Sequence, residues 1–338
     1  MNSLLLFWIF IGTLVGNVSA EIPLDPVPAP IPEINQIQPL MDKKKWPEAI
    51  ERLKAWQLTA SDPFEPGMLL AKAWLLSGER QKSLEQLHKL LALVPNKKKT
   101  LVEEQIKITS RMFMTNKAYQ TYRDGVDLLI SGRSRLAQDR FRSALDQEKE
   151  NELVLFRLGQ SLILEGDYDQ GRKFLEEARR LNPLDYSVKA WMGRAAFLSG
   201  RLVQAQQELE EGLKQAPALE ELVCWSAETW SVLGKKAKAV EFLRAHTDRH
   251  PLDLMALATL VRLEFAEVPE KTSVQRWMEI RKLVQLTMSR MDSTEQVETN
   301  RYLGEEGIGF KKADELKKEL VTLLERIDGK VEESKTQN

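Results

Sequence analysis

Residues 152–185 read ELVLFRLGQSLILEGDYDQGRKFLEEARRLNPLD, and this stretch decides the fold. Its apolar residues recur at three- and four-residue spacing on both sides of Gly166, which is the pattern of two amphipathic helices. Glycine adopts a left-handed backbone at low cost, so we expect Gly166 to end the first helix. Pro183 stops the second helix because proline lacks the backbone N–H that a helix interior needs. The stretch therefore predicts a helix–turn–helix unit of 34 residues.

The same unit recurs at a fixed step of 34 residues, and five columns of glycine, proline, tiny or large apolar residues carry the repeat. Two helices joined by a tight turn cannot bury both apolar faces alone, whereas stacked units can. The repeat predicts an array of four units, at 118–151, 152–185, 186–219 and 220–253. The columns are Gly132, Gly166, Gly200 and Gly234; Pro183, Pro217 and Pro251; Ala137, Gly171, Ala205 and Ala239; Phe141, Leu175, Leu209 and Leu243; and Gly125, Gly159, Gly193 and Ala227.

One unit carries a set of residues that resembles the signature of the tetratricopeptide-repeat (TPR) family. Leu155 and Leu162 stand where the family usually has aromatic residues, and Gly171 replaces its alanine. The resemblance implies an all-α fold, an α-α superhelix or TPR solenoid of five to six helix-turn-helix repeats with a divergent helical C-terminal cap. It also implies a protein that binds other proteins. The matching residues are Leu155, Leu158, Gly159, Leu162, Gly171, Leu175, Ala178 and Pro183.

Weaker versions of the pattern flank the four clear units. The segment 64–97 fits the same template, so we expect degenerate TPR-like repeats over 41–97. The step from there to the first clear unit is 20 residues too long, which predicts one inserted helix over 98–117. After Pro251 the signature fades into an expected helical cap over 254–328. The Lys- and Glu-rich residues 329–338 are predicted to be a disordered tail.

The N-terminus has the pattern of an export signal. An apolar run over 4–15 precedes Val18-Ser19-Ala20, so residues 1–20 are predicted to be a signal peptide cut after Ala20. The run is short for a membrane-spanning helix, which needs about 20 residues. We expect an exported protein, periplasmic or secreted, and the alternative is an uncleaved N-terminal segment that tethers it to the membrane. Six prolines in 21–40 predict an extended linker.

Composition and motifs argue against several functions. Lys+Arg number 49 and Asp+Glu 50, so the basic excess of a nucleic-acid binder is lacking. The single cysteine, Cys224, excludes an intramolecular disulfide. His246 and His250 have no third ligand nearby in sequence, so we expect no metal and interpret them as cations near a helix end. The sequence has no recognisable catalytic or cofactor-binding motif, and we expect no cofactor and no enzymatic activity.

The family resemblance also suggests where a partner would bind. In TPR arrays the first helices line a concave groove, and the second, fifth, ninth and twelfth positions of each unit face it. The Lys and Asn with which one TPR subclass clamps a carboxylate are absent at these positions, so we expect a partner helix or an apolar segment. Packing against neighbouring repeats or the inserted helix explains the aromatic members equally well. The candidate residues are Tyr119, Tyr122, Val126, Phe156, Gln160, Arg194, Phe197 and Glu228.

Two functional hypotheses follow. The first is an interaction adaptor in the bacterial cell envelope that binds a protein or peptide partner in the groove. The alternative is a self-associating structural scaffold, a homo-oligomer in which the C-terminal helices pair between subunits. A third possibility, an enzyme with its active site in 254–338, is disfavoured because that segment has no histidine or cysteine.

Overall fold

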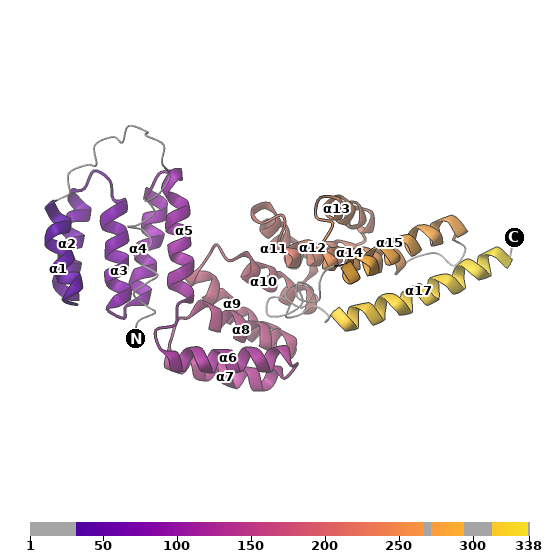
Figure 1. Ribbon diagram of the computed structural model, residues 1–338, viewed down its shortest axis with the longest axis horizontal. Coiled ribbons are helices and arrows are strands. Elements are labelled where there is room, and N and C mark those ends of the chain that lie inside the picture. Colours follow the sequence, from indigo (N-terminus) through magenta and orange to yellow (C-terminus); the bar gives the residue numbers. More distant parts are fainter. Residues whose placement is uncertain (1–31, 267–271, 294–312, 337–338) are drawn as a thin grey trace.

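The chain is an elongated stack of helices in the computed structural model, which describes residues 32–266, 272–293 and 313–336 (Figure 1). Within these ranges the secondary structure is entirely helical, so the predicted all-α solenoid is confirmed. The predicted signal peptide and residues 21–31 lie outside the described residues. The helices are α1 (Pro32–Asp42), α2 (Trp46–Thr59), α3 (Phe64–Leu76), α4 (Arg80–Leu93), α5 (Asn96–Arg111), α6 (Asn116–Ile130), α7 (Ser134–Gln147), α8 (Glu152–Leu164), α9 (Tyr168–Leu181), α10 (Tyr186–Leu198), α11 (Leu202–Gln215), α12 (Glu220–Val232), α13 (Lys236–Arg249), α14 (Leu254–Phe265), α15 (Val274–Ser293) and α17 (Ala313–Thr336).

The helices pair into hairpins, and the hairpins stack in chain order. The pairs α6/α7, α8/α9, α10/α11 and α12/α13 occupy the four predicted units, and α1/α2 and α3/α4 form two more hairpins before them. The second helix of each hairpin in the array also contacts the first helix of the next hairpin. Stacking thus completes the apolar core that a lone hairpin would leave open.

A glycine with a left-handed backbone ends the first helix of each hairpin from α3 to α12. Gly166 has φ 90°, and Gly78, Gly132, Gly200 and Gly234 have φ between 75° and 89°. The N–H of Gly166 donates to the Ile163 carbonyl at 3.1 Å, and the N–H of the next residue donates to the Leu162 carbonyl at 2.9 Å. These bonds satisfy carbonyl groups at the helix end that have no partner within the helix. The turn glycines therefore act as the sequence predicted.

A second glycine column brings the two helices of a hairpin into close contact. A Cβ atom added to Gly159 would lie 2.9 Å from the Gly171 carbonyl oxygen, and one added to Gly171 would lie 2.8 Å from the Gly159 carbonyl oxygen. The backbones of α8 and α9 therefore nearly touch, with Leu175 fully buried beside them.

The predicted extended linker over 21–40 is wrong for its last part, because α1 begins at Pro32 and continues to Asp42. Proline is tolerated at a first helical position, where its missing N–H would have no partner. Pro39 lies inside the helix, where it removes one hydrogen bond. Ile37 and Met41 of α1 are buried in one core cluster with residues of α2 and α3, so packing outweighs that loss.

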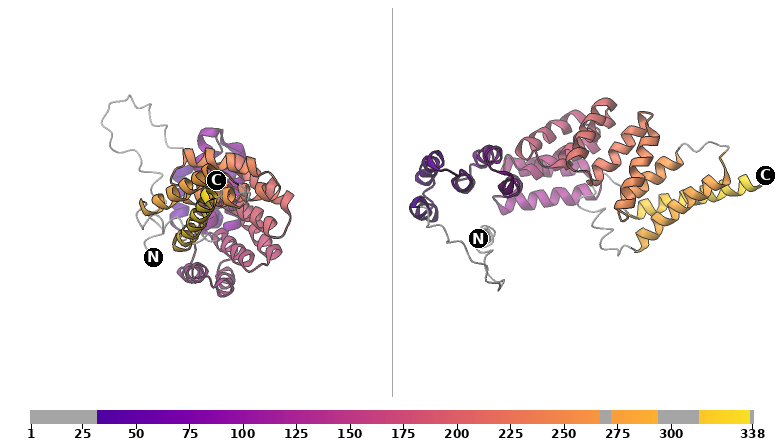
Figure 2. Two further views of the ribbon diagram at one scale, coloured as in Figure 1. Left: turned by 90° about the vertical axis from the view of Figure 1, so that its right-hand side faces the viewer. Right: turned by 90° about the horizontal axis from the view of Figure 1, so that it is seen from above.

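Helix α5 marks a change of direction in the stack. It begins two residues before the predicted insertion, at Asn96, and ends at Arg111. An extended connection, 112–115, leads to α6. Helices α1–α5 stand side by side and are steeply inclined to α6–α9 (Figures 1 and 2). Unlike α6, which pairs with α7, α5 has no hairpin partner that follows it, and it contacts α3, α4 and α8.

The C-terminal helices continue the solenoid and differ from expectation at their end. Helix α14 packs on α12 and α13, and the long helices α15 and α17 pack on each other. The prediction of a disordered tail over 329–338 is wrong for the described residues, because α17 continues to Thr336. It is held by a stripe of buried residues, Leu316, Leu320, Leu323 and Ile327, at helical spacing. None of the helices in the described ranges combines the length and the hydropathy needed to cross a bilayer.

The contact between α8 and α9 gives a stability prediction. Gly159→Ala should lower the free energy of unfolding by about 1–3 kcal/mol, because the new methyl group meets a backbone oxygen that cannot rotate away. Gly329→Ala in α17 is the matched control, since nothing lies within 4 Å of its added Cβ. The control should be neutral or stabilise by up to about 1 kcal/mol. Equal effects of the two changes in urea unfolding would contradict the close packing.

Candidate functional site

The candidate residues lie on the surface formed by the first helices of the array, which we call the first-helix face. It comprises α6, α8, α10, α12 and α14, and each of these helices contacts the next. The eight predicted partner-binding residues divide into two groups on this face. Those on α6 and α8 are mostly buried, whereas those on α10 and α12 keep part of their surface exposed.

Aromatic packing within the chain accounts for the two tyrosines of α6. The ring of Tyr122 lies 5.1 Å from Phe113 and 6.0 Å from Phe141 between centroids. Tyr119 meets the same Phe113 edge-on at 5.5 Å. Tyr122 and Val126 are only 8% and 3% exposed, so they belong to the core. Tyr119 remains 43% exposed, and it is the only one of the predicted residues on α6 and α8 that solvent reaches freely.

Phe113 is a contributor that the sequence analysis did not select. It stands in the extended connection between α5 and α6, outside any repeat column. In the sequence, the only indication of its role was an apolar side chain in the loosely periodic segment 98–117. The chain therefore supplies its own aromatic residue to the α6 end of the first-helix face.

The predicted residues of α8 are also buried. Phe156 is 7% exposed and Gln160 is 1% exposed. The Gln160 side-chain oxygen accepts a hydrogen bond from Arg157 at 2.8 Å, and that guanidinium lies 5.5 Å from the Phe156 ring centroid. For Phe156, as for Tyr122, packing describes the structure better than an open binding groove.

The accessible part of the prediction is a charged and aromatic cluster on α10 and α12. Arg194 donates to the Glu228 carboxylate at 2.6 Å. The same guanidinium lies over the rings of Phe197, at 5.2 Å, and Trp225, at 5.4 Å. The side chains of Arg194 and Glu228 are 22% and 23% exposed, so the pair is reachable from solvent.

The cluster continues toward the C-terminus as a row of alternating charge. Arg262 of α14 lies 3.6 Å from Glu228 and 3.7 Å from Glu319 of α17. Arg194, Glu228 and Arg262 are each 34 residues apart, so they occupy one repeat position on three neighbouring first helices. We call Arg194, Glu228, Arg262 and Glu319 the ionic row. The sequence analysis missed Arg262 because it ended the array at residue 253.

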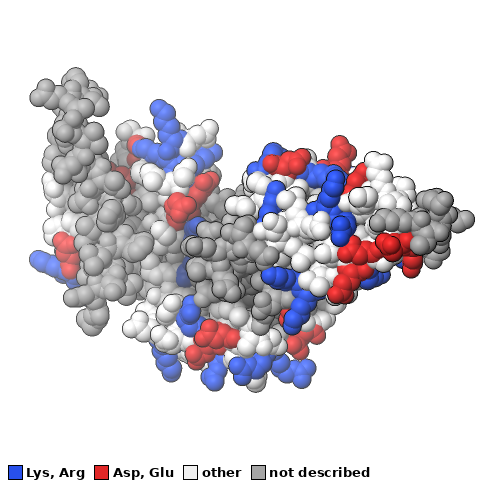
Figure 3. Space-filling view, turned by 45° about the vertical axis from the view of Figure 1, so that its right-hand side comes forward, with Lys and Arg blue, Asp and Glu red and all other residues white. Residues whose placement is uncertain are grey.

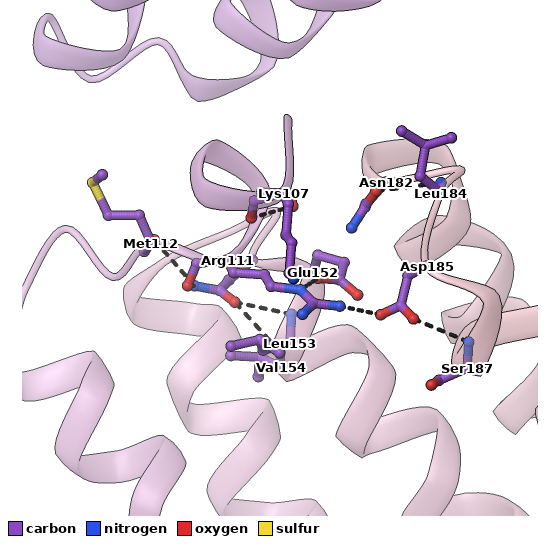
Figure 4. Close-up of polar contacts among 12 residues, drawn as sticks. Lys107, Arg111, Met112, Glu152, Leu153, Val154, Asn182, Leu184, Asp185 and Ser187 are labelled. Atoms are coloured by element: carbon purple, nitrogen blue, oxygen red, sulfur yellow. Dashed lines mark hydrogen bonds and ion pairs between the residues drawn. The ribbon is translucent and has the colours of Figure 1, made fainter. Parts of the chain in front are cut away.

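A second polar cluster joins α5 to the array. Arg111, in the last turn of α5, donates from Nε to Glu152 at 2.6 Å and pairs through its other nitrogen with Asp185 (Figure 4). Glu152 is the first residue of α8, and Asp185 caps α10 by accepting from the Ser187 N–H at 3.0 Å. The Asn151 side-chain amide donates to the backbone carbonyl oxygens of Arg111 and Met112. One guanidinium thus connects three helices.

Burial makes Glu152 titrate unusually. It is fully buried, and the loss of hydration, together with the neighbouring carboxylate of Asp185, raises the pKa of Glu152 to about 8. Arg111 acts in the opposite direction and does not offset the burial. Glu152 is therefore protonated at neutral pH, and the cluster holds one cation against one ionised carboxylate.

An adjacent ion pair strengthens the same junction. Arg80 of α4 donates to Glu148 at 3.1 Å, and both side chains are only 6% exposed. The other oxygen of Glu148 accepts from the Thr115 N–H at 2.6 Å. The connection 112–115 is thereby fixed between α4 and the end of α7.

The remaining residues that the sequence analysis considered for chemistry, Cys224 and His246, lie in the packed interior. Cys224 is buried, and burial raises the pKa of its thiol well above the usual value. His246 is buried and lies 2.7 Å from Asp253, which also caps α14. Across residues 32–266, 272–293 and 313–336, no group of metal-ligating side chains converges. On the face that Figure 3 shows, basic and acidic side chains are interspersed among the coloured residues.

The geometry places the chain in the class of helical-repeat solenoids, whose stacked units present extended binding surfaces. A model of the tetratricopeptide repeat matches residues 128–192 and 162–223. These matches, with hairpins at a 34-residue step, show that the array carries tetratricopeptide repeats. Proteins of this family are generally scaffolds for protein–protein interaction rather than enzymes.

Solved structures with similar helical repeats include a thermophilic TPR protein of Thermus thermophilus (16% identity, TM-score 0.45, covering 56% of this chain and 98% of that one). A tetratricopeptide repeat protein from Parabacteroides merdae has 12% identity and a TM-score of 0.42, covering 86% and 97%. MamA has 14% identity and a TM-score of 0.39, covering 54% and 97%. No curated protein matches the sequence.

The buried carboxyl group gives a pH prediction. Folded protein keeps the Glu152 proton up to about pH 8, whereas the unfolded chain loses it near 4.5. Between these values the native state binds more protons, so the contribution of Glu152 to stability is full below about 4.5 and is lost as pH rises through 8. The loss should be on the order of a few kcal/mol.

The neutral variant Glu152→Gln tests this linkage, because an amide oxygen still accepts from Arg111 and the amide does not titrate. In wild type, the free energy of unfolding measured in urea should fall as the pH rises from 4.5 to 9. In Glu152→Gln most of this fall should be absent. Exposed Glu177→Gln on α9 is the control and should keep the wild-type slope. If the free energy of unfolding of Glu152→Gln fell with pH as steeply as that of wild type, Glu152 would not be the protonated group responsible.

Proposed function

We propose that this protein is an interaction adaptor of the bacterial cell envelope that binds a protein segment along α10 and α12 of the first-helix face. The observation that supports the proposal is the partly exposed cluster of Arg194, Phe197 and Glu228, which combines an aromatic ring with both signs of charge. The corresponding residues of α8 are buried, so they offer a partner little surface. The ligand is a helix or an apolar segment that carries charged residues on its flanks.

The energetics favour exchange of the ion pair with a partner. Partly exposed ion pairs add only about 0–1 kcal/mol to stability. Arg194 and Glu228 can therefore turn toward a ligand without a large loss in the fold. Phe197 supplies the apolar contact, and aromatic side chains beside arginine are the residues that most often dominate binding energy at interfaces.

Export remains part of the proposal and rests on the N-terminal sequence. The apolar run over 4–15 and the small residues before position 21 support secretion with cleavage after Ala20. An adaptor in that compartment would meet partners of the envelope or of surface assembly.

Site-specific photo-crosslinking in cells tests the binding surface. A photoreactive phenylalanine derivative at position 197 should form adducts with a partner, whereas the same group at Val203 on α11, which is 67% exposed, should not. Phe197→Ala should reduce partner recovery about tenfold or more, with helicity unchanged. Val203→Ala is the matched control. Equal adducts at both positions would contradict the proposed surface, and adducts only between copies of the chain would favour the self-associating scaffold.

Fractionation tests the location separately. The tagged protein should leave the cytoplasm. Its N-terminal peptide, identified by mass spectrometry, should begin at Glu21. Deletion of residues 2–20 should retain it in the cytoplasm. An intact N-terminus in the membrane fraction would favour the tethered alternative, and an intact N-terminus in the wild-type cytoplasm would overturn export.

A further inference from the structure

Helix α5 has two neighbours of different kinds. On one side it contacts α4, as the next helix in the stack, and on the other it contacts α8, a first helix of the array. Val102 and Ile106 of α5 are fully buried and belong to the same continuous apolar core as Leu155 and Phe156 of α8. Helix α5 thus covers the beginning of α8.

The end of α5 is held by polar groups of the array. Arg111 is held by Glu152 and Asp185, and Asn151 donates to the carbonyl oxygens that close the helix. Glu152 and Asp185 lie on either side of the Arg111 guanidinium (Figure 4). Together with Asn151 they form a receptor for a helix C-terminus that carries a guanidinium, because they supply carboxylate acceptors and an amide donor.

This contact combines apolar and ionic groups. Apolar side chains of α4 and α5 join the continuous core of the array, and the cations Arg80 and Arg111 add buried or half-buried ion pairs beside it. A buried ion pair adds little net stability, yet loss of one partner is costly because the other charge stays buried. Docking of α1–α5 therefore depends on these charges as well as on the shared apolar core and the short connection 112–115.

We propose that the surface formed by Glu152, Asn151, Asp185 and the start of α8 is a second helix-binding site, which α5 occupies as a built-in ligand. The partner that fits is a helix with arginine in its last turn and apolar residues five and nine positions earlier, as Ile106 and Val102 precede Arg111. This site is separate from the Arg194–Phe197–Glu228 cluster and goes beyond the function proposed above. Such a partner binds when α5 leaves.

Opening of the full-length chain is measured first. Spin labels at Leu58 on α2 and Val203 on α11, both exposed, report the distance between α1–α5 and the array in a Cys224→Ala background. Arg111→Leu should add a population at longer distance. Arg172→Leu is the matched control, because Arg172 also pairs with a carboxylate, Glu208, but entirely inside the array. It should leave the distances unchanged.

Wild-type protein supplies a test that needs no substitution at the junction. The charged groups that face Glu152 are Arg111 from α5 and Asp185 before α10. Raising the pH from 7 to 9.5 removes the Glu152 proton and leaves two buried carboxylates against one cation. The longer distance should then appear while helicity is retained, and it should not appear in Glu152→Gln.

A labelled peptide of residues 96–112 then tests the vacated site. It should bind full-length Arg111→Leu at least tenfold more tightly than wild type, because the tethered α5 of wild type competes at high effective concentration. The peptide with leucine in place of Arg111 should bind at least tenfold more weakly. Unchanged distances in folded Arg111→Leu and in wild type at pH 9.5, or opening without peptide binding, would overturn the proposal. Phe197→Ala should alter neither readout, which separates this test from that of the adaptor surface.

Discussion

The close approach of the two helices within each hairpin is the constraint on which the rest of the structure depends. Gly159 and Gly171 let the backbones of α8 and α9 meet, and Leu175 packs against the gap beside them. A side chain at either glycine would push the helices apart and tilt the next hairpin. Because the hairpins are compact, successive first helices also touch, and equal repeat positions fall in line. The first-helix face is a consequence of this packing.

That alignment explains why one repeat position produces a row of charge. Arg194, Glu228 and Arg262 sit one helix apart, close enough for each to meet the next. Opposite signs satisfy one another, so the row remains soluble and partly exposed without a ligand. At the other end the same alignment places Tyr122 and Phe156 in the core, where the chain covers them itself. One geometry thus yields a covered half and an accessible half.

The 34-residue step predicted the hairpins of the array because each repeated residue acts through contacts within its own hairpin and does not depend on distant residues. The left-handed turn at Gly166 and the helix contact at Gly159 are of this kind. The sequence analysis missed helix α1 because the many prolines of this segment predicted an extended chain. Burial of Ile37 and Met41 against α2 and α3 stabilises the helix, and that burial depends on the packing of other helices. The burial of Phe156 was equally hidden, since the repeat position alone does not show which side chains cover it.

The contacts of Arg111 are not predicted by the 34-residue repeat. A solenoid is built from neighbours, yet Arg111 meets residues 41 and 74 positions away, and His88 of α4 lies 3.3 Å from the carbonyl oxygen of Leu181, 93 positions away. No column of the repeat encodes such contacts, because each joins residues with different repeat positions. Contacts at long sequence separation carry a larger loop-closure cost than contacts within a hairpin. The hairpins of the array are built from local contacts, whereas the docking of α1–α5 rests on these distant polar contacts together with the apolar core that α4 and α5 share with α8.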